Sequence, residues 1–198
     1  MNQPNCLPVY FALIFSCFAA GCASAPKKLN PVVYTEQALA ATDVSKVGRL
    51  EKGSAAEQKA IEQFKTFNSD FSTNNIINNT KLVYAQDLYF RDPFKEIHDE
   101  KEFEAYLLRG SSAVAEFSMQ WLDVSEHDGN YYFRWIMSVK LHRDAQDKPA
   151  SRTTGISHVR FGQDGKVIFH QDYFDGAAFI YEKIPVLGAE IRFIKKRL

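Results

Sequence analysis

Residues 115–141 read AEFSMQWLDVSEHDGNYYFRWIMSVKL and alternate apolar with polar side chains on both sides of a central turn. In both halves the large apolar residues fall on odd-numbered positions, which is the two-residue period of a strand with one buried face. The sequence HDGN at residues 127–130 is typical of a hairpin turn. This stretch therefore predicts a pair of long antiparallel strands.

The flanking sequence extends this pair into a larger antiparallel meander. Residues 157–161 repeat the odd-numbered alternation, and a second hairpin-type turn, QDGK at residues 163–166, leads into a last strand at residues 167–173. Ahead of the strands, residues 55–71 space Ile and Phe side chains three and four positions apart, as on one face of a helix. Helices followed by a curved antiparallel sheet predict the α+β class.

Further helices are expected on either side of the sheet. Residues 97–108 have the apolar spacing of a helix, and Gly110 is a typical stop signal just after it. Between the first two helices, residues 74–79 are polar and predict a loop, followed by a short helical segment and a short strand or turn. Residues 184–198 predict a last helix.

The charges of the chain balance, with 24 Lys and Arg side chains against 24 Asp and Glu. A neutral chain offers no general field that would attract a polyanion, so we expect no nucleic-acid partner. The three cysteines, Cys6, Cys17 and Cys22, all lie at the beginning of the chain. The remaining sequence therefore excludes disulfides, thiolate metal sites and a cysteine nucleophile after residue 22.

The first residues have the features of a secretion signal. Residues 1–21 contain no charged side chain, and residues 7–20 form an apolar run that is too short for an ordinary transmembrane helix. The run ends in Ala-Ala-Gly followed by Cys22, which resembles the lipobox of bacterial lipoproteins. That resemblance implies cleavage before Cys22, acylation of this cysteine, and a lipid-anchored position in the cell envelope, at the periplasmic face of the outer membrane. The alternative is a buried apolar helix.

Three segments are therefore expected along the chain. Residues 1–21 are the lipoprotein signal peptide, and residues 22–54, which have few bulky apolar side chains and no sustained period, form an acylated cysteine and a flexible tether. Residues 55–198 remain for one compact domain, which is long enough to bury a core.

Two parts of this domain resemble the sequences of one known superfamily. Residues 83–94 read VYAQDLYFRDPF, and VRF, DGKV and DYF follow one another within residues 159–174. The first stretch is similar to LYADDATVEDPF of ketosteroid isomerases, and the others resemble the ending of SnoaL-like domains. Both families have the nuclear transport factor 2-like (NTF2-like) fold. The resemblance covers about residues 57–182 and implies a cone, in which N-terminal helices pack on a curved antiparallel sheet and enclose a cavity.

The resemblance places Asp92 on the general base of ketosteroid isomerases, with Tyr89 as a supporting group. A carboxylate at the mouth of an apolar cone, between Phe90 and Phe94, loses hydration, so that its pKa rises and it can move a proton beside a carbonyl. The isomerase's oxyanion-binding Asp corresponds to Ser157, and the first helix supplies no Tyr, so ketosteroid isomerisation itself is not expected. The alternative for Asp92 is a turn residue that caps its own backbone.

His170 and Asp172 lie two positions apart on the last strand, so their side chains share one face of the sheet. If that face lines the cone, His170 is a candidate acid or base and Asp172 its orienting partner, in the manner of the His and Asp of SnoaL-type cyclases. In the alternative both point outward and Asp172 pairs with a residue such as Arg160. The five histidines show no metal-binding spacing, so we expect no metal and no cofactor.

The two long strands carry a wall of aromatic and thioether side chains. Its members are Met119, Trp121, Phe133, Trp135 and Met137. In the implied fold they belong to the core, and some also line a cavity that suits a lipid, polyketide or terpenoid fragment. We expect a membrane-anchored domain that binds an apolar small molecule, with isomerase-, cyclase- or hydratase-type acid–base chemistry as its candidate activity. The alternative is a noncatalytic envelope module that uses the outer sheet face for a protein partner or a homodimer.

The end of the chain predicts a basic amphipathic helix. Leu187, Ile191, Ile194 and Leu198 fall on one stripe, whereas the Lys and Arg residues lie elsewhere on the helix. Such a helix lies on anionic membrane lipid, or it packs on the outer surface of the cone or in a dimer interface.

Overall fold

The computed structural model describes residues 31–198. The expected signal peptide and Cys22 lie outside these residues, and so does the beginning of the expected tether. The chain divides into two units, residues 1–37 and residues 38–198, and the second contains the sheet. Within the described part, no helix combines the length and the apolarity needed to cross a membrane.

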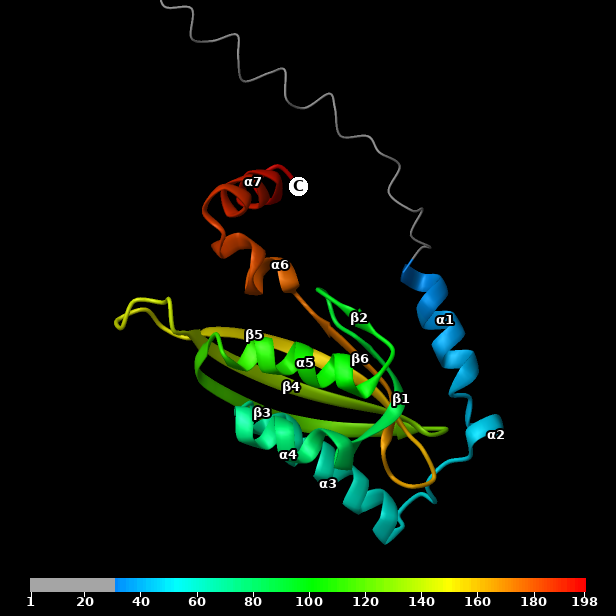
Figure 1. Ribbon diagram of the computed structural model, residues 1–198. Coiled ribbons are helices and arrows are strands. Elements are labelled where there is room, and N and C mark those ends of the chain that lie inside the picture. Colours follow the sequence, from blue (N-terminus) through cyan, green and yellow to red (C-terminus); the bar gives the residue numbers. More distant parts are fainter. Residues whose placement is uncertain (1–30) are drawn as a thin grey trace, which may run out of the picture. The chain divides into compact units, whose positions relative to one another are not determined.

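Six strands form one sheet in the order β2-β1-β6-β5-β4-β3 (Figure 1). The strands are β1 (Tyr84–Arg91), β2 (Glu96–Ile97), β3 (Val114–His127), β4 (Asn130–Leu141), β5 (Ser151–Phe161) and β6 (Val167–Phe174). The predicted antiparallel meander is confirmed as β3 to β6. The sheet as a whole is mixed, because β1 runs parallel to β6, with Phe90 opposite His170. This pairing brings the Asp-Pro turn after β1 close to the end of β6.

Helices precede, interrupt and follow the strands. They are α1 (Pro31–Ala41), α2 (Val44–Val47), α3 (Ala55–Ser69), α4 (Thr73–Val83), α5 (Glu100–Ser111), α6 (Gly176–Phe179), the short 3-10 helix η1 (Tyr181–Lys183) and α7 (Pro185–Lys195). The core lies between the sheet and α3, where Phe64 of α3, Phe133 of β4 and Val159 of β5 are fully buried. Burial of this one face explains the two-residue period of the strands.

The predicted polar loop at residues 74–79 is instead the middle of α4. The Ser72 hydroxyl accepts the backbone N–H of Asn75 and caps the helix. The Asn75 side-chain amide then donates to the Phe67 carbonyl at 2.9 Å, and Ile76 is buried in the domain. These contacts with α3 outweigh the weak helix propensity of an Asn-rich stretch.

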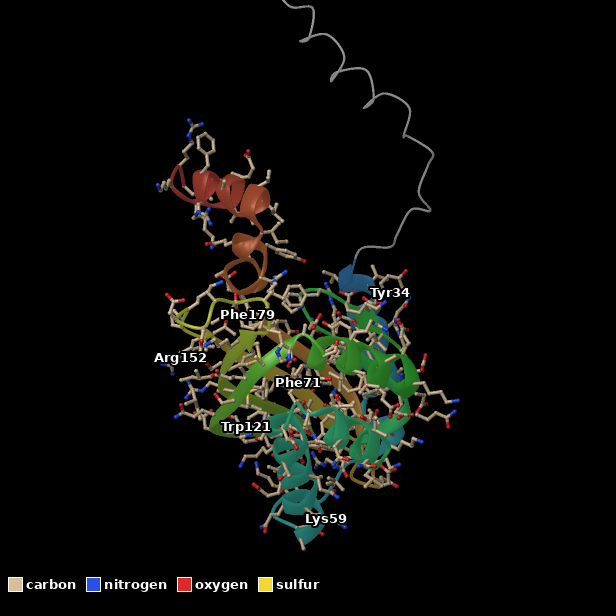
Figure 2. All side chains as sticks on the ribbon, turned by 60° about the vertical axis from the view of Figure 1, so that its left-hand side comes forward. Tyr34, Lys59, Phe71, Trp121, Arg152 and Phe179 are labelled. Carbon is tan, nitrogen blue, oxygen red and sulfur yellow. The ribbon has the colours of Figure 1, made fainter. Side chains whose placement is uncertain are left out.

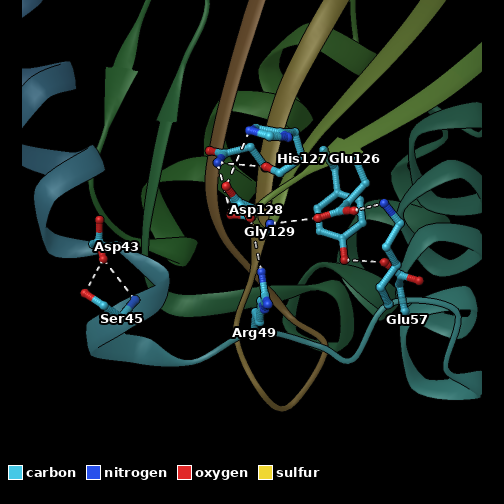
Figure 3. A network of polar contacts seen from close by, with 11 residues as sticks. Asp43, Ser45, Arg49, Glu57, Glu126, His127, Asp128 and Gly129 are labelled. Atoms are coloured by element: carbon cyan, nitrogen blue, oxygen red, sulfur yellow. Dashed lines mark hydrogen bonds and ion pairs between the residues drawn. The ribbon is translucent and has the colours of Figure 1, made fainter.

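The described part of the expected tether carries two helices and contacts the domain. Leu50 is buried in the core. Lys52 forms a 2.7 Å ion pair with Glu126 of β3, and Arg49 pairs with Asp128 in the β3–β4 turn (Figure 3). This attachment differs from the predicted flexible tether, because a single buried Leu produces no periodic pattern in the sequence.

The start of α3 is fixed by a variant of the capping box that also reaches the sheet. The Ser54 hydroxyl accepts the Glu57 N–H at 3.1 Å, while the Glu57 carboxylate accepts the Gly53 N–H at 2.6 Å. The other carboxylate oxygen of Glu57 accepts the Tyr131 hydroxyl of β4 at 2.7 Å. These bonds hold the first turn of α3 against β4.

Candidate functional site

A cavity of about 550 Å³ lies between helices α3 to α6 and the inner face of the sheet. Its wall is mostly apolar and includes Phe71 after α3, Trp121 of β3 and Phe179 of α6, which Figure 2 labels. Elements that are far apart in the sequence therefore line the same cavity.

Most of the residues singled out from the sequence line this cavity. They are Asp92, His170 and Asp172 among the candidate acid–base groups, and Phe90, Phe94, Met119, Trp121, Trp135, Met137 and Ser157 among the candidate lining residues. Strand alternation directs the odd-numbered residues of β4 to the inner face, and those from Trp135 onward reach the cavity.

Tyr89 and Phe133 lie elsewhere. Strand alternation turns Tyr89 away from the cavity that its neighbour Phe90 lines, and the Tyr89 ring stacks on Phe169 with centroids 5.2 Å apart. Phe133 is fully buried against Phe64, with ring centroids 4.6 Å apart. Tyr89 therefore does not support Asp92, and Phe133 belongs to the core beneath the cavity.

Asp92 caps its own turn and also faces the cavity. Its Oδ1 accepts the backbone N–H groups of Phe94 at 2.8 Å and Lys95 at 2.7 Å, as in an Asx turn. Its Oδ2 accepts the Tyr106 hydroxyl of α5 at 2.6 Å. The two interpretations of Asp92 are therefore compatible, because one oxygen holds the turn while the other belongs to the cavity wall.

The surroundings of Asp92 favour its protonated form. Burial raises the pKa of the Asp92 carboxyl, and the nearby Asp172 adds to the increase, while the hydrogen bonds from Tyr106 and the backbone oppose it. Burial and the charge of Asp92 also raise the pKa of Tyr106, so its hydroxyl stays protonated and remains a donor. Asp92 is thus a carboxyl group whose proton affinity is set by its burial and by a neighbouring Tyr.

His170 lies on β6, and both of its ring nitrogens have partners. Nδ1 is 3.2 Å from the Tyr84 hydroxyl, and Nε2 is 2.9 Å from Oδ1 of Asp172. Burial raises the pKa of Tyr84, which keeps its hydroxyl protonated. With the ring hydrogen on Nε2, His170 accepts from Tyr84 and donates to Asp172, so both contacts are satisfied.

Asp172 continues the network toward β4 and β5. The Ser157 hydroxyl donates to Oδ1 of Asp172 at 2.5 Å, and the indole N–H of Trp135 donates to Ser157 at 2.9 Å. The side chain of Asp172 is 19% exposed, against 3% for His170. Asp172 therefore presents more of its surface to a ligand than His170 does.

The outward orientation considered for His170 and Asp172 is wrong. Both line the cavity, and Arg160, the partner expected in that arrangement, instead donates to Asn130 and to the Leu39 carbonyl, both at 2.7 Å. The described residues, 31–198, contain no cluster of three or more His, Cys, Asp and Glu side chains that could hold a metal ion.

Tyr84 and Tyr106 are the site residues that sequence reasoning missed. Tyr106 lies on the apolar stripe of α5 and has the appearance of a core residue, and Tyr84 is the first residue of β1. A Tyr on an apolar stripe does not indicate whether its hydroxyl has a partner. Only the packing of α5 and β1 against the rest of the domain pairs these hydroxyls with Asp92 and His170.

Over residues 67–170 the sequence matches the family model of the SnoaL-like domain. No curated protein matches the chain in sequence. The matched segment contains Asp92 and His170 and ends just before Asp172.

Solved structures show the same fold at low identity. An NTF2-like protein of unknown function from Burkholderia pseudomallei aligns with a TM-score of 0.53 and 14% identity over 64% of this chain and 96% of that one. An LEH-like epoxide hydrolase from M. tuberculosis aligns with a TM-score of 0.51 and 14% identity, over 69% and 95%. A protein with a ketosteroid isomerase-like fold from Catenulispora acidiphila, solved in complex with trimethylamine, gives 0.52 and 7%, over 62% and 89%. These likenesses confirm the predicted cone.

Proposed function

Because the chain belongs to the SnoaL-like domain family, we propose that it binds an apolar small molecule in its cavity and acts on it by cofactor-free acid–base catalysis. One observation carries this proposal: Asp92 and the His170–Asp172 pair lie on the wall of an otherwise largely apolar cavity. Burying ionisable groups is costly, and such groups are concentrated at sites that transfer protons. A cavity of about 550 Å³ is in the usual range for small-molecule sites.

Asp92 is the base in this proposal. A carboxylate with a raised pKa takes a proton from a carbon beside a carbonyl more readily than an ordinary one, and its pKa lies closer to neutral pH. The protonated Asp92 then returns the same proton at another position of the ligand, which leaves the enzyme unchanged. Tyr106 stabilises the carboxylate between these steps through its 2.6 Å hydrogen bond.

Asp172 is the second acid–base group, and His170 is its positioning residue. This reverses the roles expected from the sequence. His170 has both nitrogens occupied and little exposed surface, whereas Asp172 keeps a larger exposed fraction. The His170 ring, fixed by Tyr84, holds the carboxylate in one orientation toward the ligand.

Native mass spectrometry of the full chain, exposed to a membrane and metabolite extract, tests the proposal. Wild type and Asp92→Asn are expected to retain the same small molecule, and only wild type should convert it. Asp87→Asn, an exposed change on the preceding strand β1, is the matched control and should behave as wild type. Absence of any retained ligand contradicts binding, and equal conversion by Asp92→Asn contradicts the role of this carboxyl.

Membrane attachment through acylated Cys22 is a separate part of the proposed function. The lipobox-like sequence before Cys22 supports it, and it implies a lipid-anchored domain at the periplasmic face of the outer membrane. Cells fed labelled palmitate should label wild type and a Cys17→Ser control but not Cys22→Ser. Undiminished labelling of Cys22→Ser would exclude this anchor.

A second candidate function, a protein-interaction module, is favoured by the outer sheet face. Tyr132, Ile156 and Tyr173 of neighbouring strands are all at least 39% exposed there, and Ile156 lies directly opposite Tyr173. Exposed apolar groups of this kind often mark an interface. Sedimentation equilibrium should then show a homodimer that Tyr173→Lys dissociates. A wild-type monomer would exclude self-association through this face.

A further inference from the structure

The last helix, α7, contacts the protein with its polar side. Gly188 sits so close to the backbone of Glu182 that a Cβ there would lie 2.0 Å from the Glu182 carbonyl oxygen. Arg192 donates to the same carbonyl at 2.8 Å, and Lys195 pairs with the Glu182 carboxylate at 2.5 Å. The side of α7 that packs on η1 is thus formed by a glycine and charged residues. An ordinary amphipathic helix exposes such a polar side to solvent.

The apolar side of α7 is consequently exposed. Leu187 and Ile194 lie side by side on the helix surface, roughly a quarter turn from Lys195, and Ile194 is 54% exposed. Val186 and Phe193 are exposed as well. Figures 1 and 2 both show α7 away from the sheet, beyond α6. A soluble domain normally buries the apolar stripe of such a helix, so this stripe requires a partner.

The charge around the stripe indicates the nature of that partner. Residues 185–198 carry four basic side chains and one acidic side chain. Lys196 forms no ion pair with any residue of the described chain, 31–198, and the Arg197 guanidinium lies 4.0 Å from the centroid of the Phe193 ring at the edge of the stripe. A second copy of α7 would bring this excess of positive charge against itself, whereas an anionic lipid surface attracts it.

We propose that α7 is an interfacial membrane-binding helix, which inserts Leu187 and Ile194 among lipid acyl chains while Lys196 and Arg197 contact anionic headgroups. The arrangement is that of helices lying in the plane of a bilayer, with an apolar side below and cations near the phosphates. The two contacts of Lys195 and Arg192 with Glu182 hold the helix in the orientation that keeps the stripe exposed.

The last helix is connected to the wall of the cavity, and the role of this connection rests on the function proposed above. Phe179 and Ile180 line the cavity and lead through η1 into α7. A membrane-bound α7 therefore keeps this part of the cavity wall near the bilayer, where apolar ligands accumulate.

Depth-dependent fluorescence quenching on the full chain tests the helix independently of any activity. In a Cys6→Ser, Cys17→Ser, Cys22→Ser background, which has no acyl anchor, a fluorophore is placed at Ile194→Cys or, as the matched control, at Ala189→Cys on the other side of α7. Vesicles of phosphatidylethanolamine and phosphatidylglycerol carry nitroxides on their acyl chains. Quenching is expected to be severalfold greater at position 194 than at position 189.

The charge requirement is tested in the same system. Lys196→Gln with Arg197→Gln should weaken binding roughly 25-fold, about fivefold for each cation removed. Equal quenching at the two positions, or equal quenching in vesicles of phosphatidylethanolamine alone, would overturn the proposal. Burial of the fluorophore at position 194 in the absence of vesicles, to a degree that increases with protein concentration, would also overturn the proposal. A second copy of the chain would then cover the stripe.

Discussion

The Tyr106 hydroxyl donates a 2.6 Å hydrogen bond to Oδ2 of Asp92 and thereby joins the middle of α5 to the turn after β1. The bond stabilises the charged carboxylate inside a cavity that otherwise favours its protonated form. Burial raises the pKa of Asp92 while the Tyr106 hydrogen bond lowers it, and each effect can be changed separately by mutation.

Replacing Tyr106 with Phe is expected to raise the pKa of Asp92 further. Phe keeps the ring but removes the hydrogen bond that most strongly opposes the effect of burial on this pKa. A carbon-13 NMR titration of the Asp92 carboxyl measures the change. Tyr132→Phe, on the outer sheet face, is the control and should leave the titration as it is. A lower or unchanged pKa in Tyr106→Phe would contradict the assignment.

His158 is expected to make the fold less stable in acid. Burial, with the charge of Arg160, lowers the pKa of His158 from 6.5 to about 4. The unfolded chain therefore takes up a proton before the folded one does, and stability contributed by neutral His158 above pH 6.5 is lost as the pH falls toward 4. The loss is at most about 3 kcal/mol.

Urea unfolding of His158→Gln at several pH values checks this contribution. The Gln amide can still donate to Oδ1 of Asn130, which lies 2.8 Å from the His158 ring nitrogen, but it does not titrate. The acid-induced loss should shrink in this variant and persist in His127→Gln, whose side chain is exposed. An identical pH profile for wild type and His158→Gln would refute the prediction.

Gly155→Ala should destabilise the domain by about 1 to 3 kcal/mol. Gly155 lies opposite Trp135 across β4 and β5, and a Cβ there would be 2.3 Å from the indole ring. The ring must move into the cavity or the strands must separate. Thermal unfolding measures the cost, and Thr154→Ala, an exposed neighbour, is the control. A stability equal to that of wild type would show that the indole moves freely.

Ser157→Ala should cost about 1 to 3 kcal/mol because it leaves the buried Trp135 indole N–H without its acceptor. A double-mutant cycle with Trp135→Phe isolates this bond, since the same Ser157 change should cost less once the N–H is gone. Denaturant unfolding supplies the four free energies. Strict additivity of the two changes would show that the bond contributes nothing to stability.

The sequence alone determined the main architecture and one face of the site. The two-residue alternation of β3 to β5 identified the inner side chains, because a strand buried on one face permits little else. The same alternation placed Met119, Trp121, Trp135 and Met137 on the cavity side. Local sequence likewise located the Asp-Pro turn at Asp92, whose backbone capping needs only neighbouring residues.

Only the tertiary structure decided which polar groups meet. The parallel pairing of β1 with β6 and the packing of α5 bring together Asp92, Tyr106, Tyr84 and His170, none of which is adjacent to another in the sequence. Tertiary contacts also turned a polar, Asn-rich stretch into α4. Hydrogen bonds across such separations depend on the ångström-scale positions of packed elements, and no local periodicity encodes those positions.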